Sequence, residues 1–308
     1  MHKKVFIIGN GFDLDLGWKT SYKDFIVSEY WPLRDKEPYC LMAEYLKERT
    51  EVDRWYDLEN LLKEYASDKP YNHEVASPRD EEFFYELRDC LISFLKDAIK
   101  KTVNTESMAM RVLRAVVANG YFTSIYTFNY TDLYDIAGNG GINSLFDYES
   151  VHGRLSNNSI ILGVNDNVNL REGYSYLRKV FNEHYTSHAI RYDLQECDEV
   201  VFFGHSLSEN DYPYFADFFE DQSMCTERKS GKHITIFTKD NHSRIQILEQ
   251  LRMMNGGRTE RLQNDNDFKI IMTDNPDKIL LKKFFDNLNK ESRATHERHM
   301  EHIASMLP

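Results

Sequence analysis

The N-terminal segment constrains the fold of this chain more than any other feature. Residues Lys3 to Ile8 form a short run rich in β-branched and aromatic residues, and the run ends at Gly9-Asn10-Gly11. This pattern is typical of a buried strand that feeds a tight turn. Two glycines let the backbone of such a turn approach a phosphate, and the N-terminus of a following helix adds aligned N–H donors. The segment therefore predicts an α/β fold with a turn suited to holding a nucleotide.

Strand and helix signals alternate in the second half of the chain. Strand-like runs lie at 124–128, 160–162, 200–203, 233–238 and 268–272, with a further short strand expected near Val151. Helical signals lie between and after the last two runs, at 243–253 and 276–288. Such alternation implies right-handed βαβ units and a mainly parallel sheet. We therefore predict a doubly wound α/β core.

The segment between the first two strands carries only helical signals. A capping box of Ser21 and Asp24 opens a short helix, and apolar residues then recur at helical spacing from residue 39 to residue 118. This texture predicts an insertion that caps the sheet. The resulting division of the chain is a core of residues 1–38 and 119–289, an inserted helical cap of residues 39–118, and a C-terminal helical tail of residues 290–308.

Charge and apolar patterning exclude several classes of protein. The net charge is −12 at pH 7 and no Lys/Arg-rich block is visible, so we expect no broad binding to nucleic acid or to an anionic membrane. Apolar runs such as Val200 to Phe203 are short, whereas a transmembrane helix needs about 20 apolar residues. Val5 to Ile8 is too short for the core of a signal peptide. We therefore expect a cytoplasmic protein.

The cysteines give no sign of a metal module or of a disulfide framework. Cys40, Cys90, Cys197 and Cys225 are widely spaced and form no Cys-x-x-Cys pair. In a cytoplasmic chain this spacing predicts free thiols and no bound metal.

Four motifs follow predicted strands, and parallel sheets bind ligands beyond the carboxyl ends of their strands. Ligand contacts in the first motif are expected from Gly9, Asn10, Gly11 and Phe12. The motif is not the full dinucleotide fingerprint, because Leu14 stands where a third glycine would be. Asp13 is unusual in this place. Its carboxylate either caps the helix or belongs to the site.

The second and third motifs supply polar groups of different kinds. Thr127 and Asn129 end a strand, and an asparagine can hold a sugar hydroxyl or a water, although it also serves as a turn former. His152 precedes a glycine near another short strand. Histidine titrates near neutrality and suits a general base, although a lone histidine is more often structural.

The fourth motif follows the most apolar strand of the chain. Gly204, His205 and Ser206 are expected to contact a ribose or a phosphate, together with Asp211. Ser208 and Asp211 also have the spacing of a second capping box, which would open a helix running through Phe219.

Taken together and in this order, the motifs resemble the AbiH family of bacteriophage abortive-infection proteins. The resemblance spans residues 3 to 240. It rests on Gly-Asn-Gly-Phe-Asp, residues 20–25, Trp55 to Glu59, Thr-Phe-Asn-Tyr-Thr, His-Gly, and Gly-His-Ser-Leu with a later Asp. That family is in turn similar to a distant branch of the sirtuin-like Rossmann proteins. Their Gly-Ala-Gly loop, strand-end Asn and His-Gly motif correspond to Gly9-Asn10-Gly11, Asn129 and His152-Gly153. The resemblance implies a Rossmann-like sheet with NAD as ligand.

Departures from the sirtuin pattern narrow the expected activity. The chain lacks the four-cysteine zinc module, Asn10 replaces the small alanine, and Asp13 stands near the position of a serine of that family. Protein deacylation is therefore not expected, whereas hydrolysis of the cofactor itself is compatible with these changes. Asn129 would hold the ribose or a water, His152 would accept a proton, and Asp13 would stabilise the oxocarbenium-like sugar.

The expected function is that of an anti-phage effector that binds NAD or a related nucleotide and hydrolyses its N-glycosidic bond. One alternative is a nucleotide-binding sensor without catalysis, which acts through a partner protein. A nuclease or other phosphohydrolase would need a carboxylate cluster with metal and a basic track, and the acidic balance disfavours it. The expected partners are a small-molecule nucleotide and a phage-derived trigger or partner protein. The oligomeric state, including a homo-oligomer, stays open.

Overall fold

The structure of the chain is a computed structural model. The structure describes residues 3–51, 57–67, 77–117, 120, 122–144, 146–224 and 231–289, and the predicted tail of residues 290–308 lies outside these ranges.

A six-stranded, all-parallel sheet forms the centre of the protein, with strand order β3-β2-β1-β4-β5-β6. The strands are β1 (Lys3–Ile8), β2 (Ser124–Thr127), β3 (Glu149–Ser150), β4 (Cys197–Phe203), β5 (His233–Thr238) and β6 (Asp267–Met272). Strand order reverses between β1 and β4, because the chain moves outward on one side of β1 and then returns to its other side. The predicted doubly wound parallel sheet is confirmed, and this order is the one that typically binds dinucleotides at the point of reversal.

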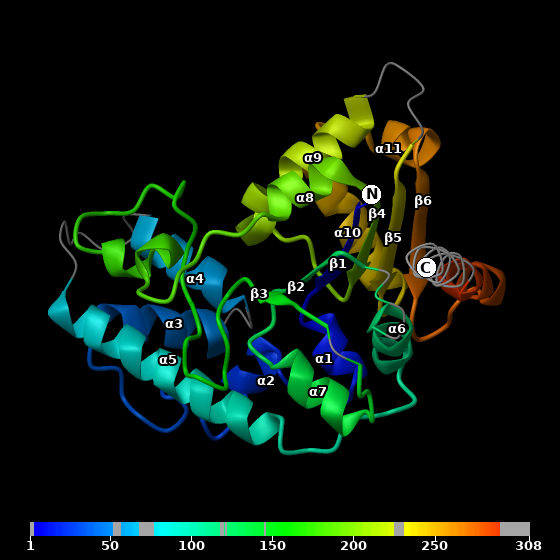
Figure 1. Cartoon of the computed structure of the whole chain (residues 1–308). Coiled ribbons are helices and arrows are strands. Elements are labelled where there is room, and N and C mark those ends of the chain that lie inside the picture. Colours follow the sequence, from blue (N-terminus) through cyan, green and yellow to red (C-terminus); the bar gives the residue numbers. More distant parts are fainter. Residues whose placement is uncertain are drawn as a thin grey trace, which may run out of the picture.

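Alternate residues of the central strands point to opposite faces, and both faces are buried. Phe6 and Ile8 of β1 join one apolar cluster, whereas Val5 and Ile7 join another. The first face is covered by α1 (Gly11–Asp15), α6 (Met108–Val117), α7 (Leu133–Asn139) and a helix over 278–289. The second face is covered by α8 (Ile190–Glu196), α9 (Tyr212–Met224), α10 (Asn241–Met254) and α11 (Thr259–Asp265) (Figure 1).

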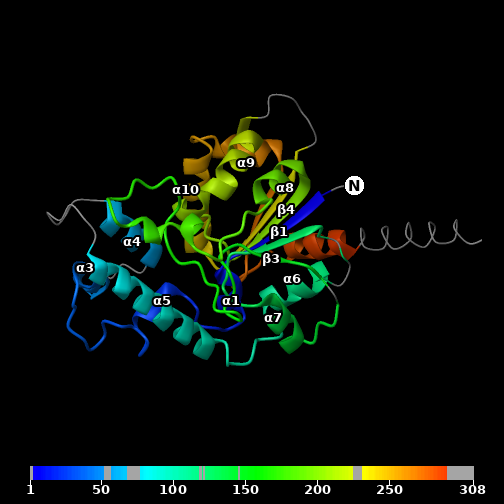
Figure 2. The ribbon, with the colours of Figure 1, turned by 60° about the vertical axis from the view of Figure 1, so that its left-hand side comes forward.

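A third apolar cluster, the helical cluster, lies beside the sheet and is mainly helical. It is built from α2 (Tyr22–Ile26), α3 (Leu41–Glu51), α4 (Leu58–Ser67) and α5 (Pro78–Ala98), together with the segment 155–177. The predicted capping box of Ser21 and Asp24 opens α2. Figure 2 shows α3, α4 and α5 as a separate layer away from the sheet. Within the predicted cap segment, α6 differs from the others because its apolar face packs on the sheet.

One predicted strand is wrong. Residues 160–162 adopt no strand conformation, although they are apolar as predicted. Ile160 and Leu162 are buried in the helical cluster, and Ile161 N donates to His152 O at 2.8 Å. A buried apolar run without a neighbouring strand therefore gave a strand-like pattern in the sequence.

Two further features concern the described residues. No helix among them is both long and apolar enough to cross a bilayer. Cys40, Cys90 and Cys197 are free thiols, and Cys225 lies outside the described residues.

Candidate functional site

Two strand-end turns meet at the point where strand order reverses. Gly11 N donates to Gly204 O at 2.8 Å, and Gly9 N donates to Phe203 O at 3.0 Å. Gly204 has a φ of +64°, and a Cβ added there would lie 2.4 Å from backbone atoms of Gly11 and Phe12. A Cβ on Gly9 would lie 2.5 Å from His205 Cα. Glycine is required here because the two turns touch, and the paired N–H groups are directed into the protein.

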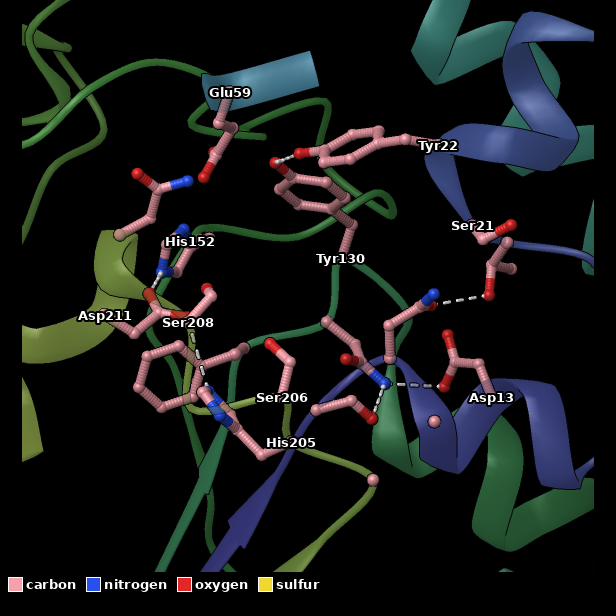
Figure 3. Close-up of a pocket in the computed structure, with 18 of the residues that line it drawn as sticks. Asp13, Ser21, Tyr22, Glu59, Tyr130, His152, His205, Ser206, Ser208 and Asp211 are labelled. Atoms are coloured by element: carbon pink, nitrogen blue, oxygen red, sulfur yellow. Dashed lines mark hydrogen bonds and ion pairs between the residues drawn. The ribbon is translucent and has the colours of Figure 1, made fainter. Parts of the chain in front are cut away.

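A cavity of about 510 Å³ opens beyond these turns (Figure 3). It lies between the carboxyl ends of the strands and the helical cluster, which contributes Tyr22, Glu59 and Leu91 to its wall. The predicted site residues that line it are Gly9, Asn10, Gly11, Asp13, Asn129, His152, Gly204, His205, Ser206 and Asp211. The structure thus brings together residues that are far apart in the sequence of the core.

Phe12 and Thr127 do not line this cavity. Phe12 is fully buried and packs edge-on against Phe203, with ring centroids 5.3 Å apart. Thr127 is also buried, and its hydroxyl accepts a hydrogen bond of 3.1 Å from Asn129 N. Both residues therefore support the turns from the protein interior and not from the cavity.

Asp13 carries a buried carboxylate at the floor of the cavity. The side chain is 1% exposed, and it accepts hydrogen bonds from Asn129 Nδ2 at 2.8 Å and from Thr131 Oγ1 at 2.9 Å. Burial raises the pKa of Asp13 to about 7, although both hydrogen bonds oppose the rise. The carboxylate does not simply cap a helix, since its hydrogen-bond partners come from the turn after β2.

Asn129 is held in one orientation by its amide group. Its Nδ2 donates to Asp13 and, at 3.1 Å, to Gly9 O. Its Oδ1 is buried and has no hydrogen-bond partner among the described residues. A buried acceptor without a partner is costly unless a ligand or a water completes it.

A second polar group combines two histidines with one carboxylate. His152 Nε2 lies 3.5 Å from Asp211 Oδ1, and His205 Nε2 lies 3.5 Å from Asp211 Oδ2. Burial lowers the pKa of His205 to about 3 and holds the pKa of His152 well below its usual range. Burial also raises the pKa of Asp211 to about 6. Both rings are therefore neutral at pH 7, while Asp211 is mostly ionised.

The predicted second capping box is wrong. Ser208 is the N-cap of a 3-10 turn (Glu209–Asp211), but its side chain makes no capping hydrogen bond. The carboxylate of Asp211 instead faces the two histidines (Figure 3). The contacts of Asp211 with these two histidines replace the local capping pattern here.

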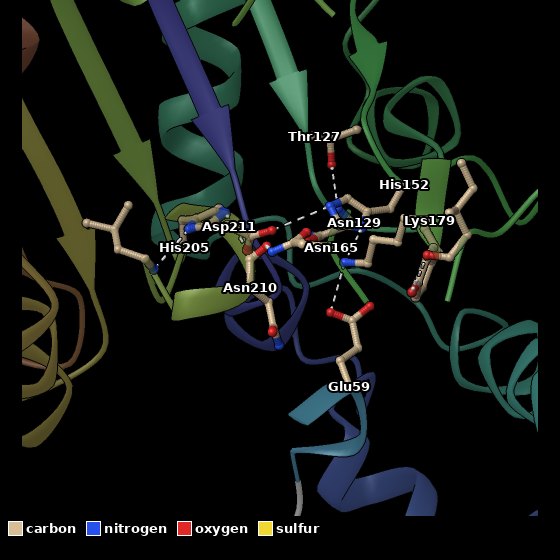
Figure 4. Close-up of polar contacts among 12 residues, drawn as sticks. Glu59, Thr127, Asn129, His152, Asn165, Lys179, His205, Asn210 and Asp211 are labelled. Carbon is tan, nitrogen blue, oxygen red and sulfur yellow. Dashed lines mark hydrogen bonds and ion pairs between the residues drawn. The ribbon is translucent and has the colours of Figure 1, made fainter. Parts of the chain in front are cut away.

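An ion pair that the motifs did not predict extends this group toward the helical cluster (Figure 4). Lys179 Nζ donates to Glu59 Oε2 at 2.9 Å and lies 3.2 Å from His152 Nδ1. Lys179 and Glu59 are 5% and 8% exposed, so the pair is buried. Burial raises the pKa of Glu59 to about 7. Glu59 lies at the end of the Trp55 to Glu59 segment, whereas nothing in the sequence marks Lys179.

Two tyrosines form an aromatic wall of the cavity. The hydroxyl groups of Tyr22 and Tyr130 lie 3.3 Å apart, and Tyr130 OH also reaches Ile161 O at 3.5 Å. Their rings lie on the side of the cavity opposite Asp211 (Figure 3). Together with Phe128 they offer flat apolar surface for a planar ring.

A neighbouring cavity of about 620 Å³ lies over β4, β5 and β6. It shares Gly11, Gly204, His205 and Ser206 with the first cavity, so the two adjoin across the paired turns. Lys19 and Lys239 line it beside three carboxylates. The first cavity is more acidic, since Lys23 is its one lysine among the described lining residues, against Asp13, Asp57, Glu59 and Asp211.

The segment that contains the site matches a known family. It includes the turn after β1, Asn129, His152 and Asp211. The family model described as bacteriophage abortive infection AbiH matches residues 5–229. Comparison with curated proteins gave no match. Because the family model covers well over half of the 308 residues, the chain belongs to the AbiH family of bacteriophage abortive infection proteins.

Proposed function

We propose that the strand-end cleft binds NAD or a related nucleotide and hydrolyses its N-glycosidic bond, as the effector step of abortive infection. The observation that carries this proposal is a set of buried carboxylates on a cavity of nucleotide size, at the point where strand order reverses. Cavities of 300–1,000 Å³ hold most small ligands. This one has about 510 Å³ and adjoins a second of about 620 Å³. A two-part ligand fits the pair.

The chemistry requires negative charge near the sugar. When nicotinamide leaves, the bond between C1′ and the ring nitrogen breaks, and the ribose passes through an oxocarbenium-like state. Asp13 and Asp211 provide carboxylates on two sides of the cavity. Fixed charges of this kind stabilise a developing cation without reorganisation. The bare Oδ1 of Asn129 suits a ribose hydroxyl or the attacking water.

Charge also suggests how the ligand lies. The cationic nicotinamide ring of NAD suits the acidic first cavity, where Tyr22 and Tyr130 can pack on it. The diphosphate then crosses the paired turns toward Lys19 and Lys239 of the second cavity. The N–H groups of Gly9 and Gly11 would not contact the phosphates, because they are already paired.

A sensor without catalysis is the second candidate. It is favoured by the burial of His152, which is 6% exposed and already contacts Lys179 through Nδ1. A protein of this kind would bind the nucleotide, leave it intact and change its affinity for a partner protein.

Turnover by the purified full-length chain separates these functions. NAD, ATP and oligonucleotides are incubated side by side, with and without extract from phage-infected cells, and products are separated by chromatography. Release of nicotinamide from NAD alone supports the proposal. Binding of NAD by calorimetry without any product supports the sensor, and cleavage of ATP or oligonucleotides would refute both.

A further inference from the structure

The hydrogen bonds around His152 determine which ring nitrogen carries its proton. Lys179 Nζ lies 3.2 Å from His152 Nδ1, and an ammonium group has donors but no acceptor. Nδ1 must therefore accept with its lone pair. In the neutral ring the proton then sits on Nε2, which faces Asp211 Oδ1.

His205 has the same arrangement with a different donor. Leu207 N donates to His205 Nδ1 at 3.0 Å, and a backbone amide is always a donor. The proton of His205 is thus also on Nε2, which faces Asp211 Oδ2. Phe128 packs against both rings, with centroids 5.3 Å from His152 and 4.5 Å from His205, and so limits their rotation.

We propose that Asp211, and not His152, is the proton acceptor of the site, and that the two histidines face it with N–H groups. In this tautomer the nitrogen that faces Asp211, Nε2, carries a proton in both rings. Neither ring therefore has a free lone pair on that side with which to accept a proton. Asp211 presents two acceptor oxygens between them. This inference rests on the proposed function for the reaction, but the ring tautomers follow from the hydrogen bonds alone.

Two polar atoms of this group are left without a partner. His152 Nε2 and Asp211 Oδ1 are buried, and neither has a hydrogen-bond partner among the described residues, because 3.5 Å is long for a direct bond. A hydroxyl oxygen that bridges them from the side of the cavity would accept from Nε2 and donate to Oδ1. The chemical class that fits is a hydroxyl group, either the attacking water or a ribose hydroxyl.

The reaction step is then balanced. The water donates its proton to Asp211 Oδ1 as its oxygen bonds to C1′ of the ribose. The bond from C1′ to nicotinamide breaks, and its electron pair neutralises the pyridinium nitrogen. Asp211 later releases the proton to solvent, so that NAD and water give ADP-ribose, nicotinamide and one proton.

Lys179 and Glu59 are positioning residues in this scheme. Glu59 Oε2 accepts a hydrogen bond from the ammonium of Lys179 at 2.9 Å. The ammonium in turn donates to His152 Nδ1 and so favours the Nε2–H tautomer. Glu59 is on α4, and Lys179 follows the segment 155–177. The helical cluster therefore determines the tautomer of His152, which lies at the edge of the sheet.

Ring nitrogen NMR tests the tautomers directly in the full-length chain labelled with ¹⁵N-histidine. Long-range ¹H–¹⁵N spectra at pH 7.5 distinguish Nε2–H, Nδ1–H and imidazolium rings, and His152→Gln and His205→Gln assign the signals. We expect Nε2–H at both rings. Lys179→Met should shift His152 toward a mixture, whereas the exposed control Lys100→Met should not. An Nδ1–H or charged His152 would overturn the inference.

Nicotinamide release tests the role of the carboxylate. Asp211→Asn should lower the rate about 10²–10⁴-fold, the usual effect of losing a general base. His152→Gln keeps an N–H donor and should retain more than a tenth of the rate. Equal losses in both variants would overturn the assignment of Asp211. If wild type releases no nicotinamide, the catalytic role of Asp211 fails together with the proposed function, whatever the tautomers.

Discussion

Replacing Asp13 by asparagine should stabilise the protein, although Asp13 is among the most buried polar residues of the cleft. Burial raises the pKa of Asp13 from an ordinary 3.8 to about 7. The unfolded chain therefore ionises first as pH rises, and the folded state loses stability between pH 4 and pH 7. Fully ionised, the folded carboxylate costs about 4 kcal/mol. Asparagine keeps the shape and removes this cost.

The expected gain is smaller than that cost, since asparagine forfeits part of the hydrogen bonding with Asn129 and Thr131. Allowing about 1–2 kcal/mol for this loss, Asp13→Asn should raise the free energy of unfolding by about 2–3 kcal/mol at pH 8. The advantage over wild type should shrink by about 3 kcal/mol between pH 8 and pH 5.

Urea unfolding at pH 5 and pH 8 measures both quantities. Asp35→Asn is the matched control, because the Asp35 side chain is 91% exposed. Its stability should follow that of wild type at both pH values. If Asp13→Asn is less stable than wild type at pH 8, or if its advantage does not depend on pH, the reasoning about the buried charge is refuted.

Three further predictions concern the same cleft. Gly204→Ala should lower the free energy of unfolding by at least about 2 kcal/mol in urea melts, because the φ of Gly204 is +64° and the added Cβ would meet backbone atoms. The control Gly138→Ala, with open space around the added Cβ, should be neutral or stabilising. Asn129→Ala should cost about 1–3 kcal/mol in the same assay, because Gly9 O and Asp13 lose a donor; an unchanged midpoint would contradict this. Nicotinamide release should rise from pH 5 to pH 7.5, since Asp211 and Asp13 ionise with pKa values of about 6 and about 7; a rate that is already maximal at pH 5 would contradict it.

The sheet could be predicted from the sequence because its strands are buried on both faces. β1 and β5 have the predicted bounds, since a parallel strand is a continuous apolar run between turn residues. Residues 160–162 have the same composition but lack a partner strand, and pairing is not encoded locally. The convergence of Asn129 and His152 on the turn after β1 followed from their position at strand ends.

Polar interactions between distant segments could not be predicted in the same way. Asp211 has the spacing of a capping box with Ser208, yet its carboxylate faces His205, which follows the same strand, and His152, which follows β3. Lys179 reaches His152 from the start of a short 3-10 helix (Lys179–Phe181), and no periodicity marks it. The motifs identify residue types at strand ends, whereas tautomers and pKa values depend on the neighbours that the fold supplies.

The most direct test of the account is the rate of nicotinamide release from NAD by wild type and by Asp13→Asn, at matched folded concentration and with extract from phage-infected cells. If the buried carboxylate of Asp13 stabilises the cationic sugar, wild type should release nicotinamide and ADP-ribose. The more stable Asp13→Asn should be slower by about 10²–10³-fold, the typical loss when one electrostatic contact to the transition state is removed. Full activity of Asp13→Asn, or intact NAD after incubation with wild type, would contradict the claim that this cleft hydrolyses NAD.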